Sequence, residues 1–262
     1  MDHPTLRVLM CATAAPTSPG LVLPMRVRHR QEMNCQIVHD SLHRRPGWTA
    51  TFALLVGDSV VGFASVAIGG PWTGKPTIVE FYVLPTHRGR AFDLFEALVG
   101  ASGARLMEIQ SNDALLAVML HTYARDISSE AIVFRDGLTT TLATSGATFE
   151  QVTSDEDIGA AIAARQGGGE WRLLVNGTAL ATGGMLFHYN APYADLYMDV
   201  AEPFRRRGFG SYLVQELKRV AYALGSVPCA RCSPHNVASR RTLQKAGFVP
   251  CAHILLGSIP TP

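Results

Sequence analysis

One stretch of this chain reads as the end of a β-strand, an arginine-rich turn and the start of a helix in direct succession. It runs Val200-Ala201-Glu202-Pro203-Phe204-Arg205-Arg206-Arg207-Gly208-Phe209-Gly210-Ser211. Unpaired amides at a helix start carry the positive end of the helix dipole. Gly208 and Gly210 would let an anion approach the backbone without meeting a Cβ atom. The stretch therefore predicts a phosphate-binding turn.

An apolar stripe with helical spacing follows this turn, and its members are Leu213, Val214, Leu217, Val220, Ala221 and Leu224. Such a stripe predicts a helix with one buried face, which Gly225 would end. The polar residues between the apolar ones are expected to face solvent, and these are Gln215, Glu216, Lys218 and Arg219.

A second pattern lies further along the chain. Residues 228–233 read as a short strand, and residues 236–248 read as a helix that Asn236 caps and Gly247 ends. A glycine-bearing turn before a helix is a weak signal alone. The two patterns in this order are more specific.

A dinucleotide-binding turn is the main alternative for the first stretch. Its third glycine would fall at Leu213, and no acidic residue follows about twenty residues on after a second strand. The sequence therefore does not fit that fingerprint.

Together, the two segments resemble the GNAT acyltransferase superfamily. Its pyrophosphate loop reads Val-x-x-x-x-Arg/Gln-x-x-Gly-x-Gly/Ala, and its next helix opens with Asn and ends in Gly-Phe. The resemblance implies an α/β (α+β) fold in which helices flank a mixed, mostly antiparallel sheet, and it implies acetyl-CoA as co-substrate. The cofactor-binding residues that it implies are Met198, Asp199, Val200, Arg205, Arg206, Arg207, Gly208, Phe209, Gly210, Ser211, Asn236 and Ser239.

The resemblance also implies a role for each part of this site. Backbone amides of residues 206–211 would hold the pyrophosphate, and Asn236 would contact the pantetheine arm. The strand edge at residues 198–200 would pair with pantetheine amides, and a free N–H there would polarise the thioester carbonyl.

The chain contains an internal repeat. Leu54–Asp58 and Leu173–Gly177 each read as a strand entering a tight hairpin, and Thr77–Val83 reads as the third strand of the first unit. Residues 83–93 then align without a gap on residues 200–210. Ala91 and Asp93 replace the two glycines, so this first loop is expected to repel a pyrophosphate.

We therefore expect two domains of GNAT type in this chain of 262 residues. Residues 25–143 would form a degenerate domain without cofactor, and residues 144–262 the catalytic domain. Residues 1–24 are expected to be disordered, and Leu138–Ala143 could be a strand shared by the two sheets. Residues 155–165 read as one helix, where the resemblance implies two helices that wall the acceptor site. The first domain would then either supply this wall and shape substrate entry, or only stabilise the second sheet or mediate dimerisation.

The chemistry that the resemblance implies is direct attack of an amine on the thioester. A strand period of two places Asp195, Tyr197 and Asp199 on one face, and Asp199 and Tyr197 are the candidate catalytic residues. His188 and Glu170 are further candidates for the base. The tyrosine that many members carry in the last helix falls on Leu243, so Tyr222, Tyr197 or water would have to protonate the thiolate.

Composition limits the partners. A net charge of +2 and a pI near 8.3 indicate no nucleic-acid partner, and no apolar run predicts a membrane span. Five cysteines form no even disulfide framework, which favours the cytoplasm, and Cys229 and Cys232 are expected to be buried strand residues. No metal site is expected.

The sequence thus predicts an acetyl-CoA-dependent N-acetyltransferase that acts on a primary amine of a small molecule or peptide. The alternative is a CoA-binding or ligand-sensing module that has kept the fold without turnover. The sequence leaves open whether the protein forms a homodimer.

Overall fold

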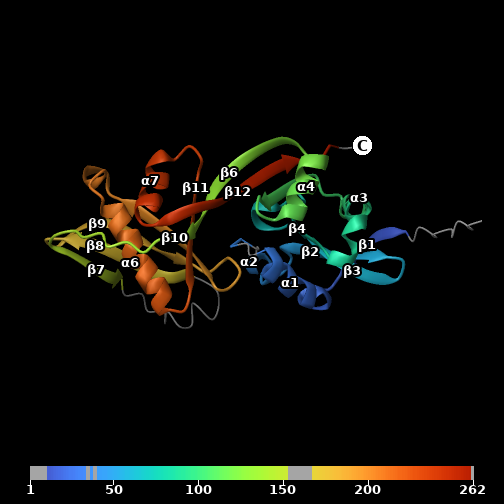
Figure 1. Ribbon diagram of the computed structural model, residues 1–262, viewed down its shortest axis with the longest axis horizontal. Helices are drawn as coiled ribbons and strands as arrows, with labels where there is room; N and C mark the ends of the chain where they lie inside the picture. The colour runs from blue at the N-terminus through green and yellow to red at the C-terminus, as the bar shows by residue number, and fades with distance from the viewer. Residues whose placement is uncertain (1–10, 34–35, 38–39, 153–166, 261–262) are drawn as a thin grey trace, which may run out of the picture.

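The computed structural model has two lobes that lie side by side and share one sheet (Figure 1). It describes residues 11–33, 36–37, 40–152 and 167–260. Lobe 1 comprises β1 to β5 with helices α1 to α4, and lobe 2 comprises β7 to β11 with helices α6 and α7. Helices flank a mostly antiparallel sheet, so the predicted α/β fold class is confirmed.

The sheet has twelve strands in the order β1-β2-β3-β4-β5-β12-β6-β11-β10-β9-β8-β7. Among the strand pairs of the described residues, only β4–β5 and β10–β11 are parallel. The strands are β1 (Ala12–Thr17), β2 (Thr49–Val56), β3 (Ser59–Ala67), β4 (Thr77–Val83), β5 (Leu106–Gln110), β6 (Arg125–Asp136), β7 (Ala147–Val152), β8 (Gly167–Val175), β9 (Thr178–Leu186), β10 (Tyr193–Val200), β11 (Val227–Cys232) and β12 (Phe248–Ser258).

The helices pack on both faces of this sheet. They are α1 (Pro19–Met33), α2 (Asp40–His43), α3 (Ala91–Ser102), α4 (Ala114–Tyr123), α6 (Phe209–Ala223) and α7 (Val237–Lys245), with short 3₁₀ turns η1 (Gly70–Trp72), η2 (Pro85–Arg90) and η3 (Glu202–Phe204). Alternate strand residues separate the two faces. Ala64 packs with α3 and α4, whereas Phe63 packs with α1. In lobe 2, Ala230 packs with α6 and α7, whereas Cys229 lies on the opposite face with Ile37.

Two long strands join the lobes (Figure 1). β12 pairs with β5 in lobe 1 and with β6, and β6 in turn pairs with β11 in lobe 2. The expectation that Leu138–Ala143 form a shared strand was therefore wrong, because β6 and β12 take that part. Residues 137–144 have no regular structure.

The segment after β6 is instead held on α6 by two side chains that were expected in solvent. Gln215 accepts from the Leu142 amide at 2.7 Å and donates to its carbonyl at 3.0 Å. The Lys218 ammonium donates to the carbonyls of Leu138 and Ala246, at 2.8 and 2.9 Å. Both side chains are buried, so the solvent-facing prediction was wrong for them. Tertiary partners override the helical pattern here.

The expectation of disorder before residue 25 was wrong for the part that the structure describes. β1 pairs along β2 from Ala12 opposite Val56 to Thr17 opposite Thr51. α1 follows directly and buries Val22 completely. Ladder hydrogen bonds and this apolar contact order a segment whose composition resembles a loop.

The repeat is visible in the strand register. In lobe 1, Leu54 lies opposite Gly62, and a bulge then brings Leu55 opposite Val60. In lobe 2 the same bulge separates the pairs Leu173–Ala181 and Leu174–Ala179. Both predicted hairpins, the strand Thr77–Val83, the strand before α7, and helices α6 and α7 are confirmed. The predicted helix at 155–165 lies outside the described residues.

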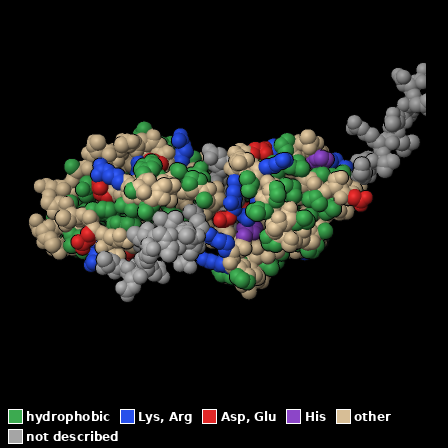
Figure 2. All heavy atoms as spheres, turned by 90° about the horizontal axis from the view of Figure 1, so that it is seen from below, with side chains coloured by type: hydrophobic (Ala, Val, Ile, Leu, Met, Phe, Trp, Pro, Cys, Tyr) green, Lys and Arg blue, Asp and Glu red, His purple; other side chains and the backbone are tan. Residues whose placement is uncertain are grey.

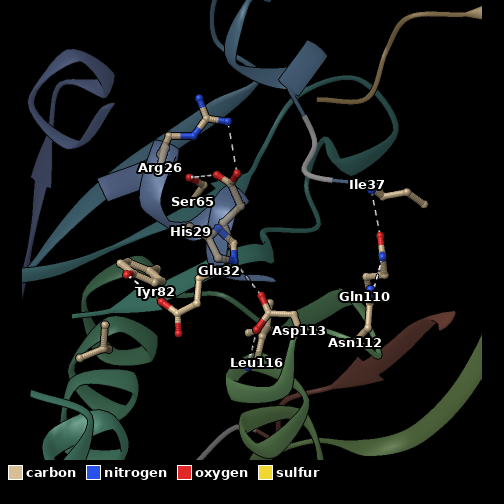
Figure 3. A network of polar contacts seen from close by, with 12 residues as sticks. Arg26, His29, Glu32, Ile37, Ser65, Tyr82, Gln110, Asn112, Asp113 and Leu116 are labelled. Carbon is tan, nitrogen blue, oxygen red and sulfur yellow. Dashed lines mark hydrogen bonds and ion pairs between the residues drawn. The ribbon is translucent and has the colours of Figure 1, made fainter. Parts of the chain in front are cut away.

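Helix α1 buries polar side chains and exposes apolar ones. Arg26 and His29 are buried, whereas Leu21, Leu23 and Val27 are exposed. Figure 3 shows the His29 ring pointing at Asp113, the residue that caps α4, with 2.9 Å between Nε2 and Oδ2. Polar contacts thus hold α1 against the rest of lobe 1, in addition to the apolar contact of Val22.

Besides the His29–Asp113 contact, lobe 1 contains a cluster of buried polar side chains with Glu80 of β4 at its centre. Its carboxylate is buried and lies within 3.2 Å of Arg26, 2.6 Å of Ser65 and 2.8 Å of His43. Burial by itself raises the pKa of Glu80, but Arg26 and His43 outweigh it and hold the pKa well below its usual range. Glu80 therefore serves as the counterion of a buried arginine.

Candidate functional site

The arginine-rich turn before α6 adopts a backbone that suits an anion. Arg206 and Gly208 both have left-handed φ angles, +63° and +88°. Gly208 is the N-cap residue of α6, and no described side chain caps the helix there. The first amides of α6 are thus left for a ligand, and alternating left-handed residues turn neighbouring amides toward one point.

The strands beside this turn separate. β10 and β11 pair only from Tyr193 opposite Val227 to Asp195 opposite Cys229. Beyond Asp195, β10 continues to Val200 and pairs with β9 alone. The predicted edge Met198–Val200 therefore lies where β10 has no described partner strand on its β11 side, so its amide and carbonyl groups can pair with an extended ligand.

The two glycines of the turn have different roles. A Cβ on Gly210 would lie 3.2 Å from both Thr242 and Val200, so Gly210 lets α6 pack against α7 and β10. Gly208 needs glycine for its backbone conformation. The expectation that an anion approaches the side of Gly210 that lacks a Cβ was thus wrong, because that side faces α7 and β10, while the Gly210 amide still belongs to the first turn of α6.

Lys245 is a site residue that the sequence analysis missed. Its ammonium lies 3.4 Å from the position that a Cβ on Gly208 would occupy. Packing of the two helices places it there, with the Ser211 hydroxyl donating to the Thr242 carbonyl at 3.2 Å. A basic residue in the last turn of a helix is an ordinary terminal charge, so no pattern distinguished it.

Asn236 and Ser239 lie together at the start of α7. The Asn236 side chain accepts from the Ser239 amide at 2.9 Å and so caps the helix as predicted. Arg205 donates to the Val200 carbonyl, and Arg207 and Phe209 follow in the same turn. The part of α7 that contacts the turn and the start of α6 is its second half, through Thr242 and Lys245.

The corresponding loop of lobe 1 is built differently. Within residues 83–93 no residue has a positive φ, and Ala91 is helical at φ −61° and ψ −37°. Asp93 sits in the first turn of α3 and accepts from Arg90 at 2.6 Å. A carboxylate of the protein thus already occupies the positive end of this helix.

The catalytic candidates on β10 lie on the face opposite α6. Three quarters of the Asp199 side chain is exposed, and its carboxylate lies 3.7 Å from Arg205. Tyr197 is half-exposed; partial burial and the negative charge of Glu170 raise its pKa. Glu170 and Tyr197 are aligned across β8 and β10 with Gly184 of β9 between them.

Asp195 is the buried member of this face. Its Oδ2 lies 3.1 Å from His188 Nε2 and 3.5 Å from Arg231 Nε. Burial and the neighbouring Asp195 charge raise the pKa of Tyr189 well above its usual value. His188 lies just after β9 and is thus close to β10 as expected.

Two tyrosine positions considered from the sequence are not at this end of lobe 2. Leu243, where the resemblance places a tyrosine, is buried in the lobe 2 core. Tyr222 is exposed in the last turn of α6, roughly 20 Å along the helix from the turn at its start. Tyr197 lies on the part of β10 that continues beyond its pairing with β11.

Lobe 1 contacts lobe 2 beside Asp195. Ile37 packs against Tyr189 and Cys229. The Ser41 amide donates to the His188 carbonyl at 3.2 Å. Figure 2 shows side chains of both charges and a histidine where the lobes meet.

Other chemical features are limited. Cys229 and Cys232 lie buried on β11 as predicted, and the described cysteines are free thiols. Among the described residues, no group of His, Cys, Asp and Glu side chains is arranged to hold a metal ion. No helix in the described ranges is long and apolar enough to cross a membrane.

Comparison with known proteins identifies one family. Residues 139–248 match the model of the Acetyltransferase (GNAT) family. No curated protein matches the sequence.

Solved structures show the same fold over nearly the whole chain. An acetyltransferase of the GNAT family from Colwellia psychrerythraea has a TM-score of 0.73 at 15% identity, over 95% of this chain and 100% of that one. A tandem GNAT protein from the clavulanic acid biosynthesis pathway, without AcCoA, has a TM-score of 0.58 at 14% identity, over 96% and 100%. A GCN5-related N-acetyltransferase from Sphaerobacter thermophilus has a TM-score of 0.53 at 15% identity, over 96% and 97%.

Proposed function

Because residues 139–248 match the model of the acetyltransferase (GNAT) family, we propose that the protein is an acetyl-CoA-dependent N-acetyltransferase. Lobe 2 binds acetyl-CoA and transfers the acetyl group to a primary amine of a small molecule or peptide. Lobe 1 binds no cofactor and forms part of the wall beside the acceptor. The free thiols suit a reducing compartment, so the cytoplasm is the proposed location.

The backbone of the turn before α6 is the observation that carries this proposal. Arg206 and Gly208 are left-handed, and the start of α6 has no cap among the described side chains. The residues proposed to hold the pyrophosphate are Arg205, Arg206, Arg207, Gly208, Phe209, Gly210 and Ser211, with their amides as the donors. Lobe 1 has no such backbone, since Ala91 is helical and no residue of 83–93 has a positive φ, and Asp93 places a negative charge in the first turn of α3.

The pantetheine arm would run between β10 and β11, where these strands separate after Asp195. The edge Met198, Asp199 and Val200 would pair with its amides, and Asn236 and Ser239 would face it from α7. A free β10 amide would polarise the thioester carbonyl in this position. The acetyl group would then lie near the lobe interface.

The transfer itself needs no covalent intermediate on the protein. The amine nitrogen attacks the thioester carbon, a C–N bond forms and the C–S bond breaks. We propose Tyr197 as the proton donor to the thiolate, because it is half-exposed and lies on the part of β10 that has separated from β11. Asp199 is the other proposed catalytic residue on β10.

A non-catalytic CoA-binding or ligand-sensing protein is the second candidate. Leu243 favours it, because this buried leucine stands where the resemblance expects the acid that protonates the thiolate. Turnover of acetyl-CoA in the presence of an amine distinguishes the acetyltransferase from the non-catalytic protein.

Calorimetric titration and thiol release test the proposal. Acetyl-CoA should saturate near one equivalent per chain. Free CoA should then appear with a thiol reagent when putrescine, tyramine or a lysine-containing peptide is added. Binding without release from any amine would favour the second candidate, and absence of binding would contradict both.

A further inference from the structure

Tyr197 on β10 and Arg231 on β11 flank the gap where these two strands separate. Asp195 opposite Cys229 is the last β10–β11 pair, and the parallel register places Tyr197 and Arg231 level with each other two residues further on. Strand alternation puts both side chains on the face of Cys229, which is the face opposite α6. Tyr197 is 43% exposed and the Arg231 side chain 42%, so a ligand can reach both.

Apolar packing closes the other face of this gap. Met198 and Val200 of β10 and Cys232 of β11 pack into the core beneath α6. An amine that attacks a thioester lying in the gap would therefore come from the face opposite α6. On its way it would pass Tyr197 and Arg231.

The Arg231 side chain reaches from β11 toward β10. Its Nε lies 3.5 Å from Asp195 Oδ2, and its guanidinium lies 5.7 Å from the centre of the Tyr189 ring. Asp195 and Tyr189 are both buried. In the part of the chain that the structure describes, no other carboxylate lies within 4.0 Å of this guanidinium. A guanidinium has five N–H donors, so Asp195 leaves donors of Arg231 for a ligand.

The charge of Arg231 determines which acceptors fit beside it. Partial burial lowers the pKa of Arg231, but Tyr189 and Asp195 outweigh burial and raise the pKa, with smaller effects of Glu130 and Glu108. The guanidinium is therefore positive at every working pH. It repels an ammonium group and attracts a carboxylate, which matches the planar fork of its N–H donors.

We propose that the acceptor of lobe 2 is a primary amine that also carries a carboxylate, as an amino acid does, and that Arg231 binds this carboxylate. This inference rests on the proposed acetyltransferase function. The Arg231 N–H groups donate to the carboxylate oxygens and hold the amine nitrogen beside the gap. The neutral amine then forms the C–N bond, the C–S bond breaks, and one amine proton ends on the CoA sulfur. The carboxylate itself takes no part in the chemistry.

A purely structural role would make Arg231 only the counterion of Asp195. Its loss would then slow the acetylation of all amines by the same factor, with or without a carboxylate. The preference between two amines that differ only in the carboxylate therefore separates the two roles.

Matched pairs of amines are the first test. Tyrosine and tyramine differ only by the carboxylate, and so do ornithine and putrescine. In the pair that is acetylated faster, kcat/KM from thiol release should be at least about tenfold higher for the amino acid, as expected for hydrogen bonds to a charged group. Equal values, or higher values for tyramine and putrescine, would overturn the inference.

Variants of Arg231 are the second test. Arg231→Gln keeps an N–H donor for Asp195 but removes the charge, so the ratio of kcat/KM within a pair should fall to about one while the acetyl-CoA affinity from calorimetry is unchanged. Arg231→Lys restores the charge without the fork and should recover part of the ratio. Arg219→Gln is the matched control, since Arg219 is an exposed arginine on α6, and it should keep the full ratio. A wild-type ratio in Arg231→Gln, or equal losses for both amines of a pair, would overturn the inference.

Failure of the proposed function would look different. A wild-type protein that binds acetyl-CoA but releases no CoA with any of these amines would overturn the acetyltransferase function and the inference with it. A wild-type protein that acetylates amines without regard to the carboxylate would overturn the inference alone.

Discussion

Arg205 donates through Nε to the backbone carbonyl of Val200 at 2.8 Å, and Arg88 makes the same bond to Val83 in lobe 1 at 3.2 Å. Each arginine thus ties a loop to the end of the strand before it. The remaining guanidinium contacts differ: Arg88 pairs with Glu32 of α1, whereas Arg205 lies 3.7 Å from Asp199. The arginine of this motif therefore shapes the loop in both lobes.

Replacing these two arginines by lysine separates loop shape from charge. Lysine keeps the charge but has no Nε–H to donate to the carbonyl. Arg205→Lys should weaken acetyl-CoA binding about fivefold in calorimetry, because one hydrogen bond of about 1 kcal/mol no longer holds the loop. Arg88→Lys should leave the affinity unchanged. Equal losses in both variants would show that lobe 1 also binds the cofactor.

Gly208→Ala tests the left-handed turn. A Cβ at φ +88° costs about 1 kcal/mol or more, so the acetyl-CoA Kd should rise at least about fivefold as the turn relaxes. Gly225→Ala is the matched control, because Gly225 has φ +70° at the other end of α6 and open space around it. The control should lose similar stability and keep its affinity. Unchanged affinity in Gly208→Ala would remove the turn from the binding site.

Lys218→Met tests the buried attachment of the segment after β6. The ammonium lies 2.6 Å from Asp136 and donates to two carbonyls, so its loss leaves a buried carboxylate without a counterion. The free energy of unfolding should fall by about 3 kcal/mol in urea denaturation. Arg219→Met, which removes an exposed pair with Glu216, should change it by less than about 1 kcal/mol. Similar small losses in both variants would contradict the structural role of Lys218.

Glu80 should make the protein sensitive to acid. Its pKa is lowered in the folded state, so its stabilising contribution is complete above the unfolded pKa and is lost as the pH falls through the folded pKa. Stability should therefore decline as the pH drops below about 4.5. Glu80→Gln should lose about 3 kcal/mol at pH 7, because Arg26 is left buried without its partner, and should show a flatter decline in acid. Parallel pH curves of the two proteins would rule out this carboxylate as the source.

The helices and the turn of the site could be predicted from the sequence, because the residues that specify each of them lie within or next to it. The apolar spacing after Gly208 determines α6, and Asn236 and Gly247 mark the ends of α7 through backbone capping that needs no distant partner. The repeat was equally readable, since each hairpin carries its own turn residues. These features predicted the fold class and the loop that lies at the start of α6.

Contacts between distant segments could not be predicted in this way. Thr13 to Pro24 were expected to be disordered, yet pairing with β2 orders β1. Gln215 and Lys218 follow a polar pattern, but the segment after β6 covers them. Lys245 reaches Gly208 only because α6 and α7 pack together.

The sequence by itself determined the two hairpins, α6, α7 and the glycine-bearing turn before α6, because the signals for these elements lie in neighbouring residues. Only the tertiary structure decided that β12 pairs with β5 of lobe 1 and that β6 pairs with β11 of lobe 2. The physical reason is that strand pairing can join any two segments with unpaired amides and carbonyls, and the choice among them is made by the packing of the whole sheet.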